Sequence, residues 1–91
     1  MITTIALGVG AWGQIDDVRA ALKLGVDCLV AGETCEWQAL RYAEDAGLGM
    51  IIAGHVNSEN PGLLSLAEFL RGKLAIRPVV FLDAGDPYQY F

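Results

Sequence analysis

The sequence is poor in basic residues and contains no long hydrophobic run. Its 91 residues include 6 Lys and Arg against 11 Asp and Glu, which gives a net charge of −5 at pH 7. Because nucleic-acid binding depends on clusters of Lys and Arg, this balance predicts no nucleic-acid partner. Charged or polar residues also interrupt every apolar stretch before the roughly 18 residues that a membrane span requires. We therefore expect a protein that binds neither nucleic acid nor a membrane.

Cysteine is also scarce. Cys28 and Cys35 are the two cysteines of the chain, and they form no CxxC pair. Residues 1–4 lack the basic stretch with which a secretory signal peptide begins. Both features predict a cytoplasmic protein in a reducing compartment.

Apolar side chains and glycine are the residues in excess. Hydrophobic residues make up 54% of the chain and the mean hydropathy is +0.41, which predicts a single domain over residues 1–91. Such an apolar composition also indicates that part of the surface is covered by another protein surface. The 11 glycines exceed the average usage of about 7%, and they lie between the predicted strands and helices.

Apolar runs alternate with segments of helical periodicity. Runs without polar alternation are typical of strands buried on both faces. They lie at residues 4–7, 28–31, 50–53 and 78–82. Apolar residues at three- and four-residue spacing predict intervening helices, bounded by caps and breakers. These helices run from Ile15 to Gly25, from an N-cap at Thr34 to Gly47, and from Pro61 to Gly72. The order βαβαβαβ predicts an α/β fold, a three-layer sandwich with a mainly parallel sheet.

The first polar segment after a predicted strand spells G-x-G-x-x-G over residues 8–13, and Glu33 follows 20 residues beyond Gly13. This spacing matches the dinucleotide-binding fingerprint. However, Asp16 and Asp17 lie in the first turn of the following helix, where two carboxylates would repel a pyrophosphate. A tight strand-to-helix turn is the favoured interpretation, and nucleotide binding is an alternative.

The second candidate is the pair His55 and Glu59, which follows the third predicted strand. His55 is the single histidine of the chain. An imidazole and a carboxylate four residues apart can converge on one divalent ion if the turn between them is helical. In the alternative interpretation, His55 is a solvated loop residue and Glu59 is an acid near a helix start.

The third candidate is the segment after the second predicted strand. Glu33 and Glu36 bring two acids to the same rim as His55, and carboxylates suit divalent metals. Cys35 is either an activated thiol at a helix start or a small residue placed there for its size. The roles of these three residues stay open, and spacing alone identifies no catalytic residue.

Three segments together resemble a known family. They read VAGE at residues 30–33, AGLGMIIAGHVNSENPG at residues 46–62, and VVFLD at residues 79–83, with DPY at residues 86–88. The chain resembles the C-terminal part of the Nif-three-like dinuclear metal centre proteins, also called GTP cyclohydrolase type-two homologues. The G-H-x-x-S-E-x-P-G segment is the most specific part of the resemblance.

The resemblance implies a fold, a site and an assembly. It implies a three-layer α/β unit present in duplicate, toroidal hexamers, and two divalent metal ions (Zn, Mn or Fe) between the two halves. His55 and Glu59 are then metal ligands. The other ligands, a paired histidine motif and an aspartate, belong to the N-terminal half. We therefore expect a homo-oligomer, or a chain that acts with a missing N-terminal half.

Two functions follow from the resemblance. In the first, the chain is part of a metal-dependent, cyclohydrolase-like hydrolase and contributes ligands to a dinuclear site. In the second, it is a non-catalytic oligomeric or regulatory module of the same fold. Nucleotide or dinucleotide binding by a βαβ domain is a further alternative.

Overall fold

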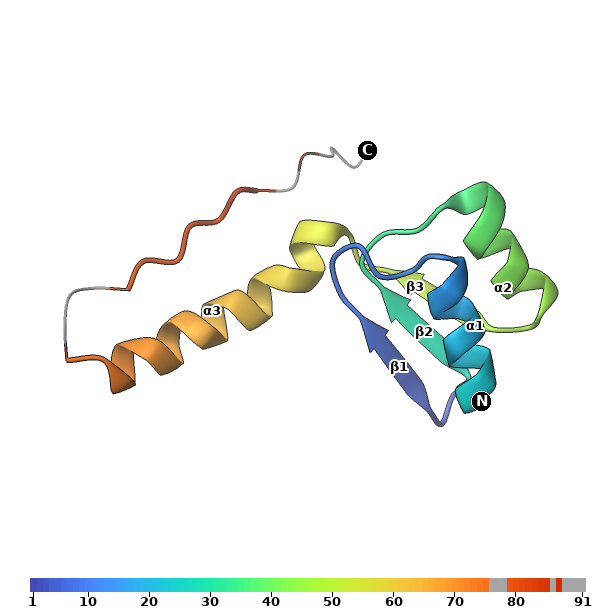
Figure 1. The fold of residues 1–91 in the computed structure, drawn as a ribbon, viewed down its shortest axis with the longest axis horizontal. Helices are drawn as coiled ribbons and strands as arrows, with labels where there is room; N and C mark the ends of the chain where they lie inside the picture. The colour runs from blue at the N-terminus through green and yellow to red at the C-terminus, as the bar shows by residue number, and fades with distance from the viewer. Residues whose placement is uncertain (76–78, 86, 88–91) are drawn as a thin grey trace.

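The computed structural model describes residues 1–75, 79–85 and 87. Within this part, three parallel strands form one sheet in the order β1-β2-β3 (Figure 1). They are β1 (Ile5–Gly8), β2 (Cys28–Ala31) and β3 (Gly49–Ile52). The helices are α1 (Ile15–Leu24), α2 (Arg41–Asp45), which directly follows the π-helical segment η1 (Glu36–Leu40), and α3 (His55–Lys73). This alternation confirms the predicted α/β fold with a parallel sheet.

The core lies between one face of the sheet and the pair α1 and α2. Val18 of α1 is fully buried, and Leu29 of β2 packs in the same cluster. Most of the remaining members are small, which lets the helices approach the sheet closely. They are Ala21, Ala31, Ala39, Ala43 and Leu48. Because both helices belong to right-handed crossovers, they lie on the same face (Figure 1).

The opposite face of the sheet is apolar and open in the single chain. Leu7, Val30 and Ile51 are partners across the three strands. They alternate with Ala6, Leu29 and Met50, which contact the core, so they project to the other side. Leu7 is 78% exposed and Ile51 is 53% exposed.

The third helix begins earlier than the sequence predicts. It starts at His55 instead of Pro61, and Pro61 lies inside it. Gly54 leaves β3 with φ of +88°, a conformation that favours glycine, and this turn allows the helix to begin at the next residue. The predicted end at Gly72 is also one residue early, because the helix continues to Lys73.

The predicted N-cap of the second helix is wrong. Cys35, not Thr34, precedes η1. The Thr34 hydroxyl instead donates a hydrogen bond of 2.7 Å to the carbonyl of Gly13. Thr34 therefore joins two loops of the sheet edge instead of capping a helix. Gly47 follows α2 with φ of +74°, in the breaker position that the sequence predicts.

The predicted fourth strand is wrong in the part that the structure describes. Residues 79–82 have no strand pairing there, and Pro78 lies outside the described residues. The segment runs along α3 (Figure 1), where Val79 and Leu82 line a groove with Leu66. The Arg71 Nε donates a hydrogen bond of 2.8 Å to the Val79 carbonyl. None of the helices in the described part combines the length and apolar character needed to span a membrane.

Candidate metal site

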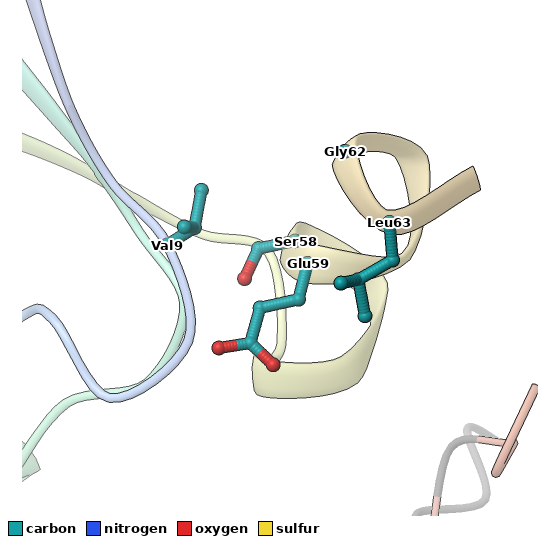
Figure 2. Close-up of a pocket in the computed structure, with 5 residues that line it drawn as sticks. All are labelled: Val9, Ser58, Glu59, Gly62 and Leu63. Atoms are coloured by element: carbon teal, nitrogen blue, oxygen red, sulfur yellow. The ribbon is translucent and has the colours of Figure 1, made fainter. Parts of the chain in front are cut away.

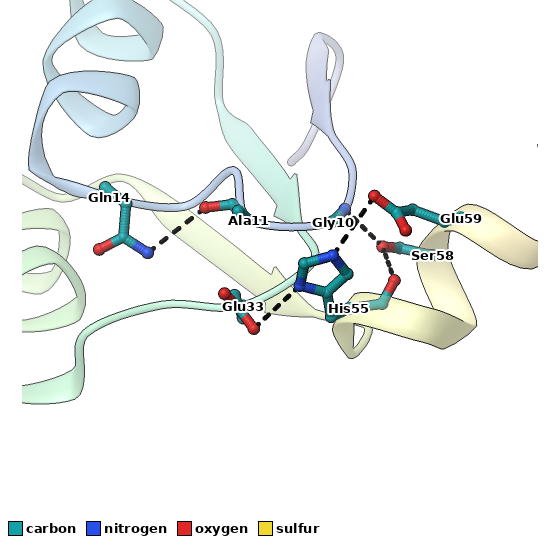
Figure 3. Close-up of polar contacts among 7 residues, drawn as sticks. All are labelled: Gly10, Ala11, Gln14, Glu33, His55, Ser58 and Glu59. Atoms are coloured by element: carbon teal, nitrogen blue, oxygen red, sulfur yellow. Dashed lines mark hydrogen bonds and ion pairs between the residues drawn. The ribbon is translucent and has the colours of Figure 1, made fainter. Parts of the chain in front are cut away.

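Three loops meet at the carboxyl ends of the strands. They are the glycine-rich loop after β1, the segment that begins with Gly32 after β2, and the first turn of α3 after β3 (Figure 3). This edge is where parallel α/β sheets place their ligand sites. The described structure therefore brings all three polar segments of the sequence to one place.

His55 lies between two carboxylates (Figure 3). Its Nδ1 is 3.1 Å from Glu33 Oε2, and its Nε2 is 3.4 Å from Glu59 Oε1. All three side chains are about half exposed. The helical turn that begins at His55 supplies the i,i+4 geometry on which convergence of His55 and Glu59 depends.

Ser58 ties the first turn of α3 to the glycine-rich loop. Its hydroxyl donates a hydrogen bond of 2.8 Å to the His55 carbonyl. The same oxygen accepts a hydrogen bond of 2.8 Å from the Gly10 N–H. Ser58 thus holds the turn that carries His55 and Glu59 against the loop that follows β1. The sequence analysis missed this role, although the G-H-x-x-S-E segment contains the residue.

Glycine is required where the loops touch. A Cβ at Gly10 would overlap Glu59 Oε1, and Gly10 has φ of +66°. A Cβ at Gly32 would overlap the backbone of Gly10, and one at Gly13 would overlap the Glu33 carbonyl. Gly10 and Gly13 of the G-x-G-x-x-G segment therefore serve close packing of the loop against the other two segments.

The start of α1 is already occupied by an acid of the chain itself. Asp17 Oδ2 accepts hydrogen bonds from the N–H groups of Gly13 (3.0 Å) and Gln14 (2.9 Å). A phosphate at this helix start would meet that carboxylate at close range. The geometry thus strengthens the argument against a dinucleotide in this turn.

The pair His55 and Glu59 fits a shared metal ion. Zinc binds imidazole nitrogen at about 2.0–2.1 Å and carboxylate oxygen at about 2.0–2.2 Å, so two ligand atoms of one tetrahedral zinc lie roughly 3.4 Å apart. The observed separation of Nε2 and Oε1 is 3.4 Å. Across residues 1–75, 79–85 and 87, no group of three or more His, Cys, Asp or Glu side chains could hold an ion. These residues therefore fit part of a metal site.

The three candidate residues that follow β2, Glu33, Cys35 and Glu36, differ in their positions relative to His55. Glu33 contacts His55, as described above. Glu36 begins η1 with an exposed side chain, and Cys35 is a partly buried free thiol at its start. Of Glu33, Cys35 and Glu36, the structure therefore brings Glu33 into contact with His55.

A hollow opens beside Glu59 (Figure 2). It has a volume of about 380 Å³ and is lined by Val9, Ser58, Glu59, Gly62 and Leu63. Its size is at the lower end of the range for small-molecule sites, and Val9 and Leu63 give it an apolar wall.

Fold and site together describe an α/β protein with a histidine and a carboxylate at the carboxyl edge of its sheet. Residues 1–87 match the family model of Duf34/NIF3 (NGG1p interacting factor 3). The chain belongs to this family, which confirms the resemblance seen in the sequence.

The relatives are named GTP cyclohydrolase 1 type 2 homologs. The chain is 37% identical over 78 residues to the one from Pseudomonas aeruginosa, covering 86% of this chain and 29% of that protein. It is 34% identical over 92 residues to the one from Clostridium perfringens, covering 99% of this chain and 34% of that protein. The homolog from Archaeoglobus fulgidus is 40% identical over 66 residues, covering 72% of this chain and 26% of that protein. The chain thus spans about a third or less of these relatives. No solved structure matches it significantly.

Proposed function

We propose that this chain contributes His55 and Glu59 as ligands to a dinuclear divalent metal site of a hydrolase. The observation that supports this proposal most directly is the 3.4 Å separation of His55 Nε2 and Glu59 Oε1 at the carboxyl edge of the sheet. Family membership supports it, because the relatives carry the name of a cyclohydrolase homolog. The metals would be Zn, Mn or Fe, with two ions in the complete site.

The chemistry divides between the metal and the chain. When bound, the metal would polarise a substrate oxygen or supply a hydroxide near neutral pH. His55 and Glu59 would hold it on the first turn of α3, and Ser58 would keep that turn against the Gly10 loop. The hollow lined by Val9 and Leu63 would receive a small substrate next to Glu59.

The site needs ligands from elsewhere. Two protein ligands are fewer than the three that catalytic zinc sites have, and the described residues converge on no third. We propose that the remaining ligands come from a region that corresponds to the rest of the relatives' length, or from another subunit of a homo-oligomer such as a hexamer. The free thiols of Cys28 and Cys35 are consistent with the reducing cytoplasm that we propose as its location.

Metal stoichiometry tests the proposal. A form of the chain complemented with the amino-terminal portion of a relative is expected to bind two Zn, Mn or Fe ions by elemental analysis. His55→Ala should lose one ion, and Glu59→Gln should weaken binding at the same position.

Glu68→Gln is the matched control, because Glu68 is an exposed acid of the same helix that has no place in the site. It should leave the stoichiometry at two. If His55→Ala also retains two ions, the assignment of these ligands is wrong.

A non-catalytic assembly module is the second candidate. The open apolar row Leu7, Val30 and Ile51 favours it, because an exposed apolar patch marks an interaction surface. Such a module would associate in solution whether or not metal is bound. Loss of association on removal of metal would contradict this second candidate.

A further inference from the structure

We infer that Glu33 is a positioning residue that fixes which nitrogen of His55 is free to bind a metal. The inference rests on the proposed function. It starts from the contact of Glu33 Oε2 with His55 Nδ1 at 3.1 Å, on the side of the imidazole opposite to Glu59.

The backbone around Glu33 is held from both sides. The N–H of Gly32 donates to the carbonyls of Gly8 (2.8 Å) and Trp12 (3.1 Å). The hydroxyl of Thr34 donates to the Gly13 carbonyl at 2.7 Å. The Glu33 carbonyl itself lies so close to Gly13 that a Cβ there would overlap it. The loop therefore places the Glu33 side chain at a defined point of the sheet edge.

The contact selects a tautomer. An ionised carboxylate only accepts hydrogen bonds, whereas a neutral imidazole has one N–H and one free lone pair. Both carboxylates can accept, but the Nδ1 contact with Glu33 (3.1 Å) is shorter than the Nε2 contact with Glu59 (3.4 Å), so we expect the proton on Nδ1 and the lone pair on Nε2, which faces Glu59. Histidine ligands of metals nearly always donate their other N–H to a carboxylate, a carbonyl or water, which orients the ring and raises its basicity.

The same geometry argues against two other roles of Glu33. As a ligand of the ion held by Nε2 and Glu59, it would have to reach around the ring, because it contacts the opposite nitrogen. As the acid that binds a ribose hydroxyl in the dinucleotide fingerprint, it would have to give up its contact with His55. Glu33 is therefore the residue that orients His55.

The experiment uses the single histidine of the chain, because its two ring nitrogens give unambiguous ¹⁵N NMR signals. At alkaline pH, where an imidazole is neutral, the metal-free 91-residue chain is expected to carry its proton on Nδ1. Glu33→Ala should shift the proton population toward Nε2. Glu33→Gln should retain part of the Nδ1–H form, because the amide oxygen is still an acceptor.

Zinc titration of the complemented form, which supplies the remaining ligands, gives the second readout. Glu33→Ala should weaken zinc binding by about 10- to 100-fold, the usual cost of losing such a partner. Glu36→Ala is the matched control, since Glu36 is a nearby exposed acid of the same segment, and it should change neither the tautomer nor the affinity. Circular dichroism verifies that each variant is folded.

The two possible failures are distinguishable. If Glu33→Ala leaves the tautomer unchanged, the inference about Glu33 is overturned. If zinc does not bind at His55 Nε2 in the wild-type chain or in its complemented form, the proposed function is overturned, while the tautomer still decides the role of Glu33.

Discussion

Asp27 joins the amino-terminal residues to the sheet through one carboxylate oxygen. Its Oδ2 accepts hydrogen bonds from the backbone N–H and the hydroxyl of Thr3, both at 2.8 Å, and from the same groups of Thr4 at 2.9 and 3.0 Å. The hydrogen bonds from Thr3, followed by those from Thr4, hold the pKa of Asp27 far below its ordinary value of 3.8. The ionised form therefore stabilises the folded chain.

The pH dependence of stability follows from this shift. A carboxyl whose pKa is lower in the folded state contributes stability above its unfolded pKa and loses it as the pH falls toward its folded pKa. Asp27→Asn should therefore lower the free energy of unfolding at pH 7, and its difference from wild type should shrink as the pH falls below about 4. Denaturant unfolding at a series of pH values measures both effects.

Asp16→Asn is the control for Asp27. Asp16 pairs with Arg19 at 3.1 Å, but both side chains are largely exposed, so its replacement should change stability little. A difference between Asp27→Asn and wild type that stays constant from pH 7 to strongly acidic pH would contradict the prediction.

At the scale of helices and strands, the start of α3 is the feature that local sequence rules predict wrongly. Proline usually begins a helix, and this rule predicts a start at Pro61. The helix begins a turn and a half earlier because Gly54 adopts φ of +88° and because Ser58 receives the Gly10 N–H. A contact across 48 positions of the chain is invisible to periodicity.

Pro61 leaves α3 without one backbone donor. Pro61→Ala would supply an N–H to the carbonyl one turn earlier and should raise the local stability of α3 by about 1 to 3 kcal/mol. Native-state hydrogen exchange of the α3 amides measures this change. Zinc binding should be unaffected, because the proposed ligand atoms belong to His55 and Glu59.

Gly62→Ala is the control that distinguishes the effect of an added N–H donor on stability from the effect of higher helix propensity. Gly62 lies in the same helix with open space around it, and its replacement should add about 1 kcal/mol without a new donor. If amide protection in Pro61→Ala is lower than in wild type, the prediction is wrong.

At the scale of the whole molecule, the sheet has one covered face and one open face. Val18, Leu29 and the alanines of α1, η1 and α2 fill the covered side. On the other side, Leu7, Val30 and Ile51 form a continuous row, and Ile51 is 53% exposed. The sequence predicts strands that are buried on both faces. In the described part of the chain, the helices cover one face of the sheet.

The open row predicts self-association. Wild-type chain should be larger than a monomer in light scattering at micromolar concentration, and Ile51→Glu should shift it toward the monomer because a charge would be buried in the interface. Trp37→Glu is the control, since Trp37 is an exposed aromatic residue of η1, which packs on the covered face of the sheet. A monomeric wild-type chain would contradict the prediction.

The sequence by itself determined the family, the first three strands, the bounds of α1 and the breaker at Gly47. Each of these depends on a local pattern of apolar residues, caps and glycines, or on the G-H-x-x-S-E-x-P-G segment. It also singled out His55 and Glu59, because i,i+4 spacing needs one helical turn to bring two side chains together.

The tertiary structure decided the remainder. It showed that the glycines of residues 8–13 serve loop packing, that Thr34 joins two loops, and that residues 79–82 lie along α3. It also placed Glu33 on Nδ1 of His55. These outcomes depend on which loops meet at the sheet edge, and that is set by the parallel register of β1, β2 and β3, which joins residues far apart in the chain.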